Sequence, residues 1–425
     1  MSDNRTGSSA DGPRSRTGQL CLPSQQGGHA VFEQFGGNAS VVHGSGWLVI
    51  GWGSGHAVLN LFDGQMTSPP SGNDTTLNYT ASMQSFNMIN LLGSNVVFDT
   101  AVSANSTRAL KLASTSGNLG AVVNLNAGTL IANRIYAGSS GTPSRFGFNG
   151  GTLQANASGT LLQSGLTAAT VYSGGAKVEV PGNITAQVTQ ALTPPYGYGL
   201  KSVGLTSGGS AYVGAPVVII GSDHGSGATA IATVDLTDGS PTRGQVNGFT
   251  VTSPGSGYHP GDTSLVVSLV GGGCAAPAVP GTCTLALNDT QGGLLKTGAG
   301  MLMLSGINTY GGATTISNGT LRLGAPHGVP PDGMVHVVNG GIYDLGMQDA
   351  TNGTVNLVNG TLQSGTLRAR LQKTGGGVAN VYSTRVVSGV PIVVESGTLR
   401  LGGRGDLGLF EGRLGSVFDI TTPNP

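Results

Sequence analysis

The tripeptide Gly-Thr-Leu returns along this chain at a spacing of roughly 20 residues, and no other feature constrains the fold as strongly. Copies at residues 128–130, 151–153, 319–321, 360–362 and 397–399 mark the repeat, and two further copies, at 159–161 and 365–367, fall between them. A unit of this length cannot bury its own apolar face, so successive units must stack to build a continuous core. The recurrence therefore predicts a solenoid of short β-strands.

The residue types within each unit favour a chain that turns sharp corners. Asn and Gly, as in Asn318-Gly319, tolerate positive φ, and the Thr and Leu that follow begin a strand with Leu directed inward. Asn residues stacked on successive coils are expected to form an amide ladder. Asn-Gly is equally a hairpin signal, so an antiparallel meander is the alternative. The return of the same half-unit after one coil favours a parallel β-helix.

Composition supports a folded all-β chain and excludes several classes of protein. The 75 glycines have no Gly-X-Y period, which excludes collagen. Only 9% of residues are charged and mean hydropathy is +0.09, unlike a disordered chain. Formal net charge is zero with no basic cluster, so nucleic acid is not expected as a partner. Apolar runs such as Val217–Ile220 are too short to span a bilayer.

The stack is interrupted once. Gly208-Gly-Ser-Ala-Tyr212 and Pro254-Gly-Ser-Gly-Tyr258 each lead into an apolar strand pattern, which predicts a small duplicated β module. The resulting organisation has five parts: a disordered N-terminal tail (1–28), N-terminal coils (29–195), the inserted module (196–290), C-terminal coils (291–403) and a C-terminal tail (404–425).

Residues 292–324 carry a longer pattern, in which Lys-x-Gly-x-Gly precedes alternating Leu, Asn-x-Tyr and Gly-Thr-Leu. Its positions are Lys296, Gly298, Gly300, Leu302, Leu304, Gly306, Asn308, Tyr310, Gly312, Thr314, Gly319, Thr320 and Leu321. This stretch resembles the autotransporter-associated β-strand repeat, also named the passenger-associated transport repeat, of bacterial surface and secreted proteins. The copy at 371–402 resembles it less closely, because it lacks Asn-x-Tyr. The insert resembles the Gly-Ser-Gly-Tyr repeats of other bacterial surface proteins.

The resemblance implies a right-handed parallel β-helix passenger that lies outside the cell or on its surface. Members often end in a membrane β-barrel, for which the final residues leave no room, so a barrel translocator or another export route is expected outside this sequence. The polar N-terminus, 1–18, lacks the apolar core of a signal peptide. For an exported protein, the signal is likewise expected outside the sequence.

Candidate chemistry is sparse. Asp223-His224 is either an acid/base or metal pair or a polar turn, and the turn is favoured because no third group is evident. Asp235 and Asp238 are expected on loops of the insert. Cysteine and histidine lack zinc-site spacing, and no glycine cluster fits a phosphate loop. No catalytic, metal or cofactor site is therefore predicted, and the chain is not expected to be an enzyme.

Two motifs are candidates for other roles. Arg404-Gly405-Asp406 is either an adhesive tripeptide of the kind integrins bind or a charged Gly turn. Cys274 and Cys283 bracket a Gly/Pro loop and either form a loop-closing disulfide or are two free thiols. Cys21, in the polar tail, is expected to be free.

These features together predict a non-enzymatic, adhesin-like surface or secreted passenger. Its rigid β-helix would present loops, and above all the insert, to a host or cell-surface glycan or protein. One alternative is a carbohydrate-active β-helix, such as a polysaccharide lyase or hydrolase, which needs clustered carboxylates in a groove. Another is a spacer or export-driving repeat fragment without a ligand.

Overall fold

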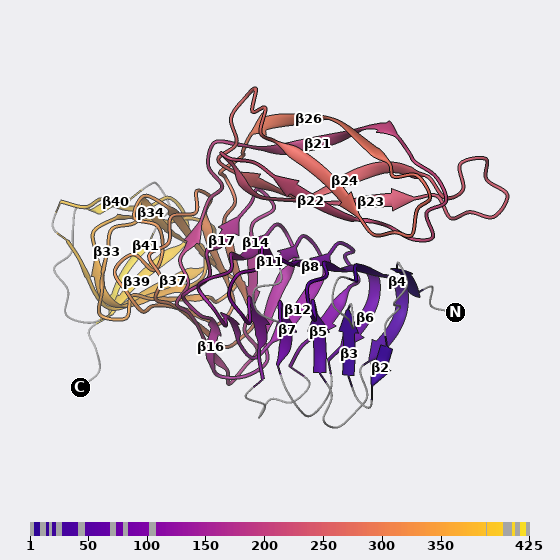
Figure 1. The fold of residues 1–425 in the computed structure, drawn as a ribbon. Coiled ribbons are helices and arrows are strands. Elements are labelled where there is room, and N and C mark those ends of the chain that lie inside the picture. Colours follow the sequence, from indigo (N-terminus) through magenta and orange to yellow (C-terminus); the bar gives the residue numbers. More distant parts are fainter. Residues whose placement is uncertain are drawn as a thin grey trace. The chain divides into compact units, whose positions relative to one another are not determined.

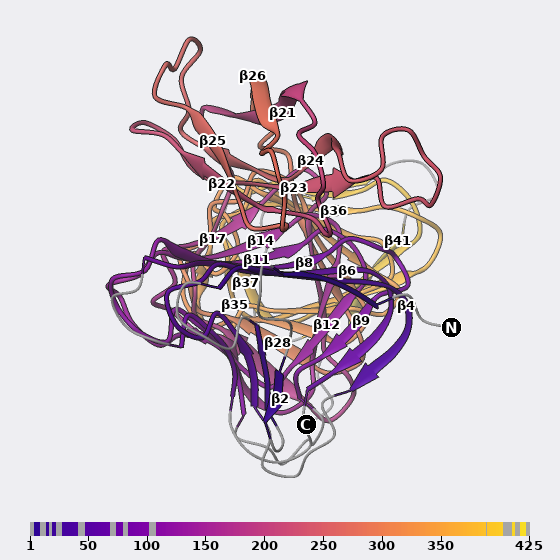
Figure 2. The ribbon, with the colours of Figure 1, turned by 45° about the vertical axis from the view of Figure 1, so that its right-hand side comes forward.

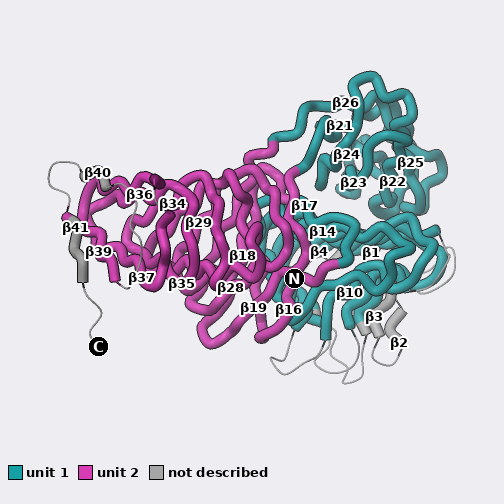
Figure 3. The backbone as a smooth tube through the Cα atoms, turned by 90° about the vertical axis from the view of Figure 1, so that its left-hand side faces the viewer, with its two compact units in different colours: residues 1–151, 165–170, 195–289 teal, residues 152–164, 171–194, 290–425 magenta. Residues whose placement is uncertain are grey.

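The chain is built from β-strands and loops. A computed structural model describes residues 4–8, 14–16, 19–22, 28–40, 47–68, 74–79, 84–101, 108–387, 389–402, 410–412 and 417–421, and no helix occurs among them. The chain divides into two compact units (Figure 3), which are residues 1–151, 165–170 and 195–289, and residues 152–164, 171–194 and 290–425. Each unit is described by itself.

Unit 1 contains the N-terminal coils, whose strands pair in parallel with those of the next coil. One sheet runs through β4 (Ala30–Ser40), β6 (Ala57–Thr67), β8 (Phe86–Leu91), β11 (Gly120–Leu125) and β14 (Ser144–Phe148). The opposite sheet runs through β5 (Trp47–Ile50), β7 (Thr75–Leu77), β10 (Leu110–Leu112) and β13 (Ile135–Ala137). Parallel pairing requires a crossover through the other sheet, so the chain coils, and the antiparallel meander is wrong.

Unit 2 repeats this arrangement with two rows of parallel strands. The first contains β15 (Thr152–Ala155), β18 (Ala176–Glu179), β27 (Leu294–Thr297), β29 (Thr314–Ser317), β31 (Met334–Val338), β34 (Thr354–Leu357), β36 (Arg370–Lys373), β38 (Ile392–Val394) and β40 (Phe410–Gly412). The second contains β16 (Gly159–Leu162), β19 (Thr185–Val188), β28 (Met301–Leu304), β30 (Thr320–Leu323), β32 (Ile342–Asp344), β35 (Thr361–Leu367), β37 (Val378–Val386), β39 (Thr398–Gly402) and β41 (Val417–Thr421). The chain is a parallel β-helix.

The stack continues in register across residues 196–290. Ala176 of β18 pairs with Leu294 of β27, and Thr185 of β19 pairs with Met301 of β28. The coil before the segment and the coil after it are therefore direct neighbours, and the segment itself lies outside the ladder of coils.

That segment folds as an antiparallel module, called the insert below, within unit 1 (Figures 1 and 2). Its strands are β21 (Tyr198–Ser207), β22 (Val217–Gly221), β23 (Ser226–Val234), β24 (Val246–Ser256), β25 (Val266–Val270) and β26 (Val279–Leu287). The two motif tyrosines are buried and play matching roles: the hydroxyl of Tyr212 accepts from the amide of Ala278, and that of Tyr258 from the amide of Ala228.

Strand pairing also reaches the two segments that were expected to be tails. β1 (Asn4–Ser8) runs antiparallel to β4, and β3 (Gln19–Leu22) runs parallel to β5. At the other end β41 continues the sheet beyond β39. The physical reason is that a terminal coil strand leaves a row of unpaired backbone groups, which a flanking segment satisfies by adding a strand.

Glycine is required at the corners because the next coil lies against them. Gly128, Gly319 and Gly397, the first residues of three Gly-Thr-Leu units, have φ values of +63°, +61° and +76°. A Cβ atom on Gly319 would lie 2.4 Å from the carbonyl oxygen of Gly298 on the preceding coil. The leucines that follow, such as Leu321, are fully buried as predicted.

Gly319→Ala is expected to lower the free energy of unfolding by much more than Gly340→Ala. Gly340 has a similar φ of +76° but open space around its Cβ position, so its substitution costs only the left-handed backbone strain of about 1–2 kcal/mol. Thermal unfolding of both variants measures the difference. Equal losses would mean that close coil packing does not set the need for glycine.

Two lysines occupy core positions in unit 2. Consecutive coils place Val178, Lys296, Ile316, Val337, Leu357, Lys373 and Val394 in one register. Both lysines are fully buried. Lys296 Nζ donates to the carbonyls of Thr297 (2.8 Å), Gly298 (2.6 Å) and Asn318 (3.2 Å). Lys373 Nζ makes the equivalent three bonds to Thr374, Gly375 and Ser396, so each lysine ties its own corner to the next coil.

Lys296→Met is expected to destabilise the protein by roughly 1–3 kcal/mol near neutral pH, because buried carbonyls lose their donor. Burial lowers the pKa of Lys296 to about 8, opposed by the nearby charge of Glu179. Between pH 8 and the unfolded pKa of 10.5 the unfolded chain holds a proton that the folded chain lacks, so stability gained from Lys296 rises with pH.

The measurement is urea unfolding at pH 7 to 10 of the wild type, Lys296→Met, and the exposed control Lys201→Met. The difference between wild type and Lys296→Met should grow with pH, by at most about 1.4 kcal/mol per unit, while Lys201→Met should track the wild type. A difference that is flat across this range would contradict the assignment.

Candidate functional site

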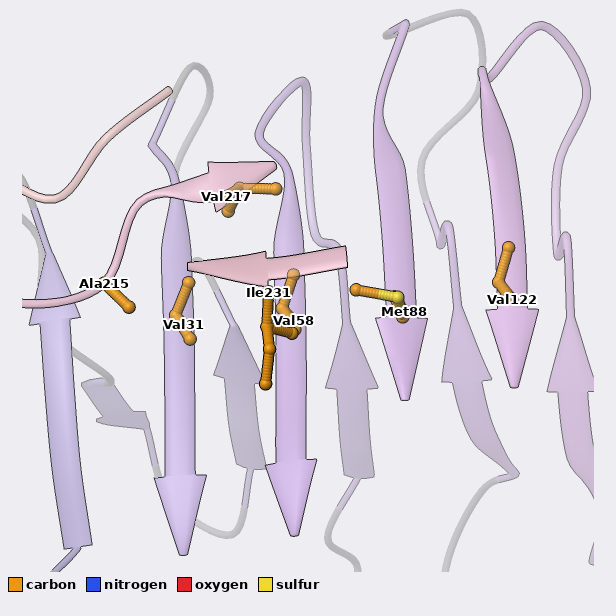
Figure 4. Close-up of a cluster of buried hydrophobic side chains, with 7 residues drawn as sticks. All are labelled: Val31, Val58, Met88, Val122, Ala215, Val217 and Ile231. Atoms are coloured by element: carbon orange, nitrogen blue, oxygen red, sulfur yellow. The ribbon is translucent and has the colours of Figure 1, made fainter. Parts of the chain in front are cut away.

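The insert packs on an apolar row that the N-terminal coils expose on their outer face. Val31, Val58, Met88 and Val122 follow one another in register on β4, β6, β8 and β11. In Figure 4 they lie on successive strands, with Val217 and Ile231 of the insert on strands that run across them. Ala215 completes the cluster, in which every member is buried. The next residue in this register is Arg145, whose Nη2 donates to Ser226 Oγ at 3.0 Å.

A buried amide ladder runs beside this row. Asn60, Asn90 and Asn124 occupy one register. Asn90 Nδ2 donates to Asn60 Oδ1, and Asn124 Nδ2 donates to Asn90 Oδ1, both at 2.8 Å. Asn124 also donates to Thr229 Oγ1 of the insert at 2.9 Å. An amide ladder therefore exists within the strands, whereas the sequence predicted one at the Asn-Gly corners.

Two stacked histidines support the start of these coils. The rings of His29 and His56 lie 4.9 Å apart and nearly parallel. His29 Nδ1 accepts from the amide of His56 at 3.2 Å, and His56 Nδ1 accepts from the amide of Phe86 at 2.8 Å. Both contacts need unprotonated Nδ1 atoms. Burial, followed by the neighbouring His29, lowers the pKa of His56 to about 4.

The free energy of unfolding is expected to fall between pH 6.5 and pH 4 because of His56. In this window the unfolded chain protonates His56 while the folded chain keeps it neutral, so the unfolded state binds the extra proton. His56→Asn retains a hydrogen-bond acceptor that does not titrate, and it should flatten this slope in acid. The exposed control His327→Asn should leave it unchanged. Urea unfolding across this range decides, and identical slopes in all three proteins would refute the role of His56.

Asp223 and His224 lie on the turn between β22 and β23, where a third residue joins them. His224 Nδ1 lies 3.4 Å from Asp262 Oδ1, and the carboxylate of Asp262 is fully buried. Ser222 Oγ and Ser264 Oγ each donate to Asp262 at 2.5 Å, while Asp223 contributes its backbone amide to Ser264 Oγ. These hydrogen bonds from Ser222 and Ser264 hold the pKa of Asp262 far below its usual range.

The hydrogen bonds of this cluster stabilise a turn, and they do not match a catalytic arrangement. Ser222 donates to the carboxylate, whereas a hydrolytic triad needs serine to donate to histidine. Glycoside hydrolysis needs two facing carboxylates with one of them protonated, but Asp262 is ionised and its acceptors are engaged. Sequence reasoning missed Asp262 because it lies far along the chain from His224, although its Pro-Gly-Asp-Thr-Ser setting is a turn signal.

Asp235 and Asp238 form another turn in the insert. Asp235 accepts from Ser240 Oγ, from Thr242 Oγ1 at 2.7 Å and from the amide of Thr237, and these bonds hold its pKa far below the usual range. Asp238 points to solvent and pairs with Arg243 at 3.2 Å. The two carboxylates thus have separate structural partners.

The remaining sequence candidates divide into described and undescribed residues. Cys274 and Cys283 are free thiols that pack in separate clusters, one beside Tyr212 and one beside Tyr258. Arg404, Gly405 and Asp406 lie outside the described residues, as does the side chain of Cys21. In the described part of the chain, no group of three or more His, Cys, Asp or Glu side chains is placed to hold a metal ion. Nor does this part contain a helix that is long and apolar enough to cross a membrane.

The outward side of the insert has a groove of about 840 Å³ that sequence reasoning did not find. Its two walls are β25 with the turn before it, and β26. The lining is made of Pro, Gly, Thr, Val, Leu and Cys residues with one charged residue, the buried Asp262. Alternation of apolar and polar residues predicts such strands, but it gives no sign of which strand edges remain unpaired.

Comparison with known proteins agrees with this architecture. Residues 294–323 match the family model of the passenger-associated-transport-repeat. The chain carries a passenger-associated transport repeat. Within the repeat, Asn308 and Tyr310 are buried, and Asn308 joins the coils on either side by accepting from Leu192 N and donating to Gly328 O. The characteristic residues of the repeat, including Lys296, therefore stabilise the stacking of the coils.

A curated relative extends the comparison beyond the repeat. The Adhesin BmaC autotransporter of Brucella suis biovar 1 (strain 1330) is 29% identical over 218 residues. The matched region is 49% of this chain and 5% of that protein, so the chain spans a small part of its relative's length. No solved structure matches the chain.

Proposed function

We propose that this chain is part of the passenger of a bacterial surface or secreted protein, and that its insert is a non-catalytic adhesive surface carried by a β-helical scaffold. The observation that carries the proposal is the direct pairing of β18 with β27. The coils stack without residues 196–290, so these residues are free to serve another purpose. The transport repeat and the likeness to an autotransporter adhesin support a place outside the cell.

The way in which the insert is held also supports display. The apolar row, the amide ladder and the Arg145–Ser226 bond fix one side of the insert to the coils. The opposite side is held away from them, and exposed Val213, Val266 and Leu287 lie in the insert. A rigid scaffold with a variable insertion is a common way of positioning a binding surface. The natural target class is a glycan or protein on a cell surface.

Deletion of residues 196–290 tests the proposal. The deletion joins coils that already pair, but it uncovers the apolar row, so the deletion protein should also carry Val31→Thr, Val58→Thr, Met88→Thr and Val122→Thr. We expect at least tenfold weaker binding to cultured epithelial cells and to a glycan array than for the full chain. Circular dichroism and melting should show that the remaining coils stay folded.

Other outcomes point to the alternatives. Retained binding by the folded deletion protein would favour a spacer, or a site elsewhere, and Asp406→Ala in the full chain then tests the Arg404–Asp406 tripeptide. Depolymerisation of a polysaccharide by the full chain that is lost in Asp262→Asn would favour a carbohydrate-active enzyme. Either result would overturn the insert as a purely adhesive surface.

A further inference from the structure

The insert is an incompletely closed ring of strands. Antiparallel pairing gives the order β24-β23-β22-β25, and β21 pairs with β26. The two sets meet where the amide of Tyr258 donates to the carbonyl of Tyr198 at 3.1 Å, next to β24. The order of strands around the ring is therefore β26-β21-β24-β23-β22-β25. Within the described residues no strand pairs with the outer edge of either β25 or β26, and Figure 2 shows β25 beside β22 and β26 beside β21.

The groove of about 840 Å³ lies at this opening, because it is lined by β25 and β26 together. Leu265, Val267, Cys283 and Leu285 line it and are half-buried against the core that contains Leu200 and Tyr258. The neighbouring residues Val266, Thr282 and Thr284 are exposed. The opening thus has an apolar floor and, along each wall, a strand edge whose backbone donors and acceptors have no strand partner.

β25 lacks the devices that normally protect an edge strand. Folded proteins blunt such edges with lysine, proline, a bulge or a covering segment. β25, Val-Val-Ser-Leu-Val, contains no charge and no proline, and it pairs with β22 without a register shift. An exposed edge of this kind recruits another strand.

We propose that this opening is an acceptor site for one extended peptide strand from another protein, which would pair with β25 and β26 at once. The inference deepens the proposed function and rests on it, since it names the partner class of the same surface. A single strand offers hydrogen-bonding groups on both of its edges, whereas a second copy of this chain would offer one edge of a folded sheet and satisfy only one wall.

The lining also defines the sequence class of the partner. The floor accepts apolar side chains from alternate positions of the added strand, and the other positions face solvent. Asp262 is the sole charged lining residue and its carboxylate is already engaged by Ser222 and Ser264. The site therefore favours a neutral peptide with alternating apolar and polar residues over a strongly basic or acidic one.

The test starts with a phage-displayed library of random nine-residue peptides, selected on the full chain. Selected peptides should alternate in polarity and bind at least tenfold more weakly to the double variant Val266→Lys/Thr284→Lys, which places charge at both edges. The matched control Val213→Lys, equally exposed in the insert but outside the groove, should bind as the wild type does. Absence of any selected binder, or binding that ignores the two lysines, would overturn the proposal.

N-methylation of the selected peptide tests the pairing itself. Successive amides of a strand point to opposite sides, so a peptide held between two edges should weaken at least tenfold whether its odd or its even amides are methylated. Sensitivity to only one set would mean docking on one edge and would contradict the site as proposed. Hydrogen exchange should slow in both β25 and β26, and alkylation of Cys283 should slow in a Cys21→Ser/Cys274→Ser background.

These outcomes separate the inference from the proposed function. Peptides that bind the groove of a chain that fails to adhere to cells would leave the acceptor site standing without adhesion. Adhesion that depends on the insert but ignores Val266→Lys/Thr284→Lys would leave adhesion standing without the acceptor site. A dimer of the wild type that Val266→Lys dissociates would show that a second copy fills the opening and would overturn the choice of partner.

Discussion

Parallel hydrogen bonding between successive coils is the constraint on which the rest of the structure depends. It fixes each residue directly over its counterpart, so one position must satisfy the same environment on every coil. Rows such as Leu302, Leu321, Tyr343 and Leu362 become a continuous core, and the corners must let the next coil approach closely. Wherever a polar residue enters such a row, it must find its partner along the stack, as the asparagines and the two lysines do.

The coils and the insert differ in how completely their strands are paired by backbone hydrogen bonds. In the described coils the strands pair in parallel with strands of the neighbouring coils, and additional strands at the ends extend the pairing. The insert leaves two edges of its ring without strand partners and carries them on a base fixed by Val31, Val58 and Asn124. Rigidity is concentrated where the coils stack, and recognition can be confined to a place where pairing is incomplete.

Much of the fold could be predicted because its signals are local. The corner chemistry of Asn318-Gly319 and the following leucines specified turns, inward faces and a stack, and the repeat pattern identified its type. The docking of the insert could not be predicted, since Val31, Val58, Met88 and Val122 recur at irregular intervals and gain meaning only once coil register is known. Lys296 was visible as a motif residue, but its burial was not, because lysine is almost never fully buried without partners, and its partners are backbone carbonyls. The contact of His224 with Asp262 could not be predicted either, because only the folded insert brings these two turns together.

The apolar row on the outer face of the N-terminal coils has a consequence for how the chain matures. Those coils are made from residues up to about position 148, yet their outer surface is completed by side chains as far along as Ile231. Coils formed before that later segment is present would expose the apolar row to solvent. Their assembly is thus tied to the emergence of the module they carry, and a chaperone or membrane surface that shields this row would govern the time at which the module can seat itself.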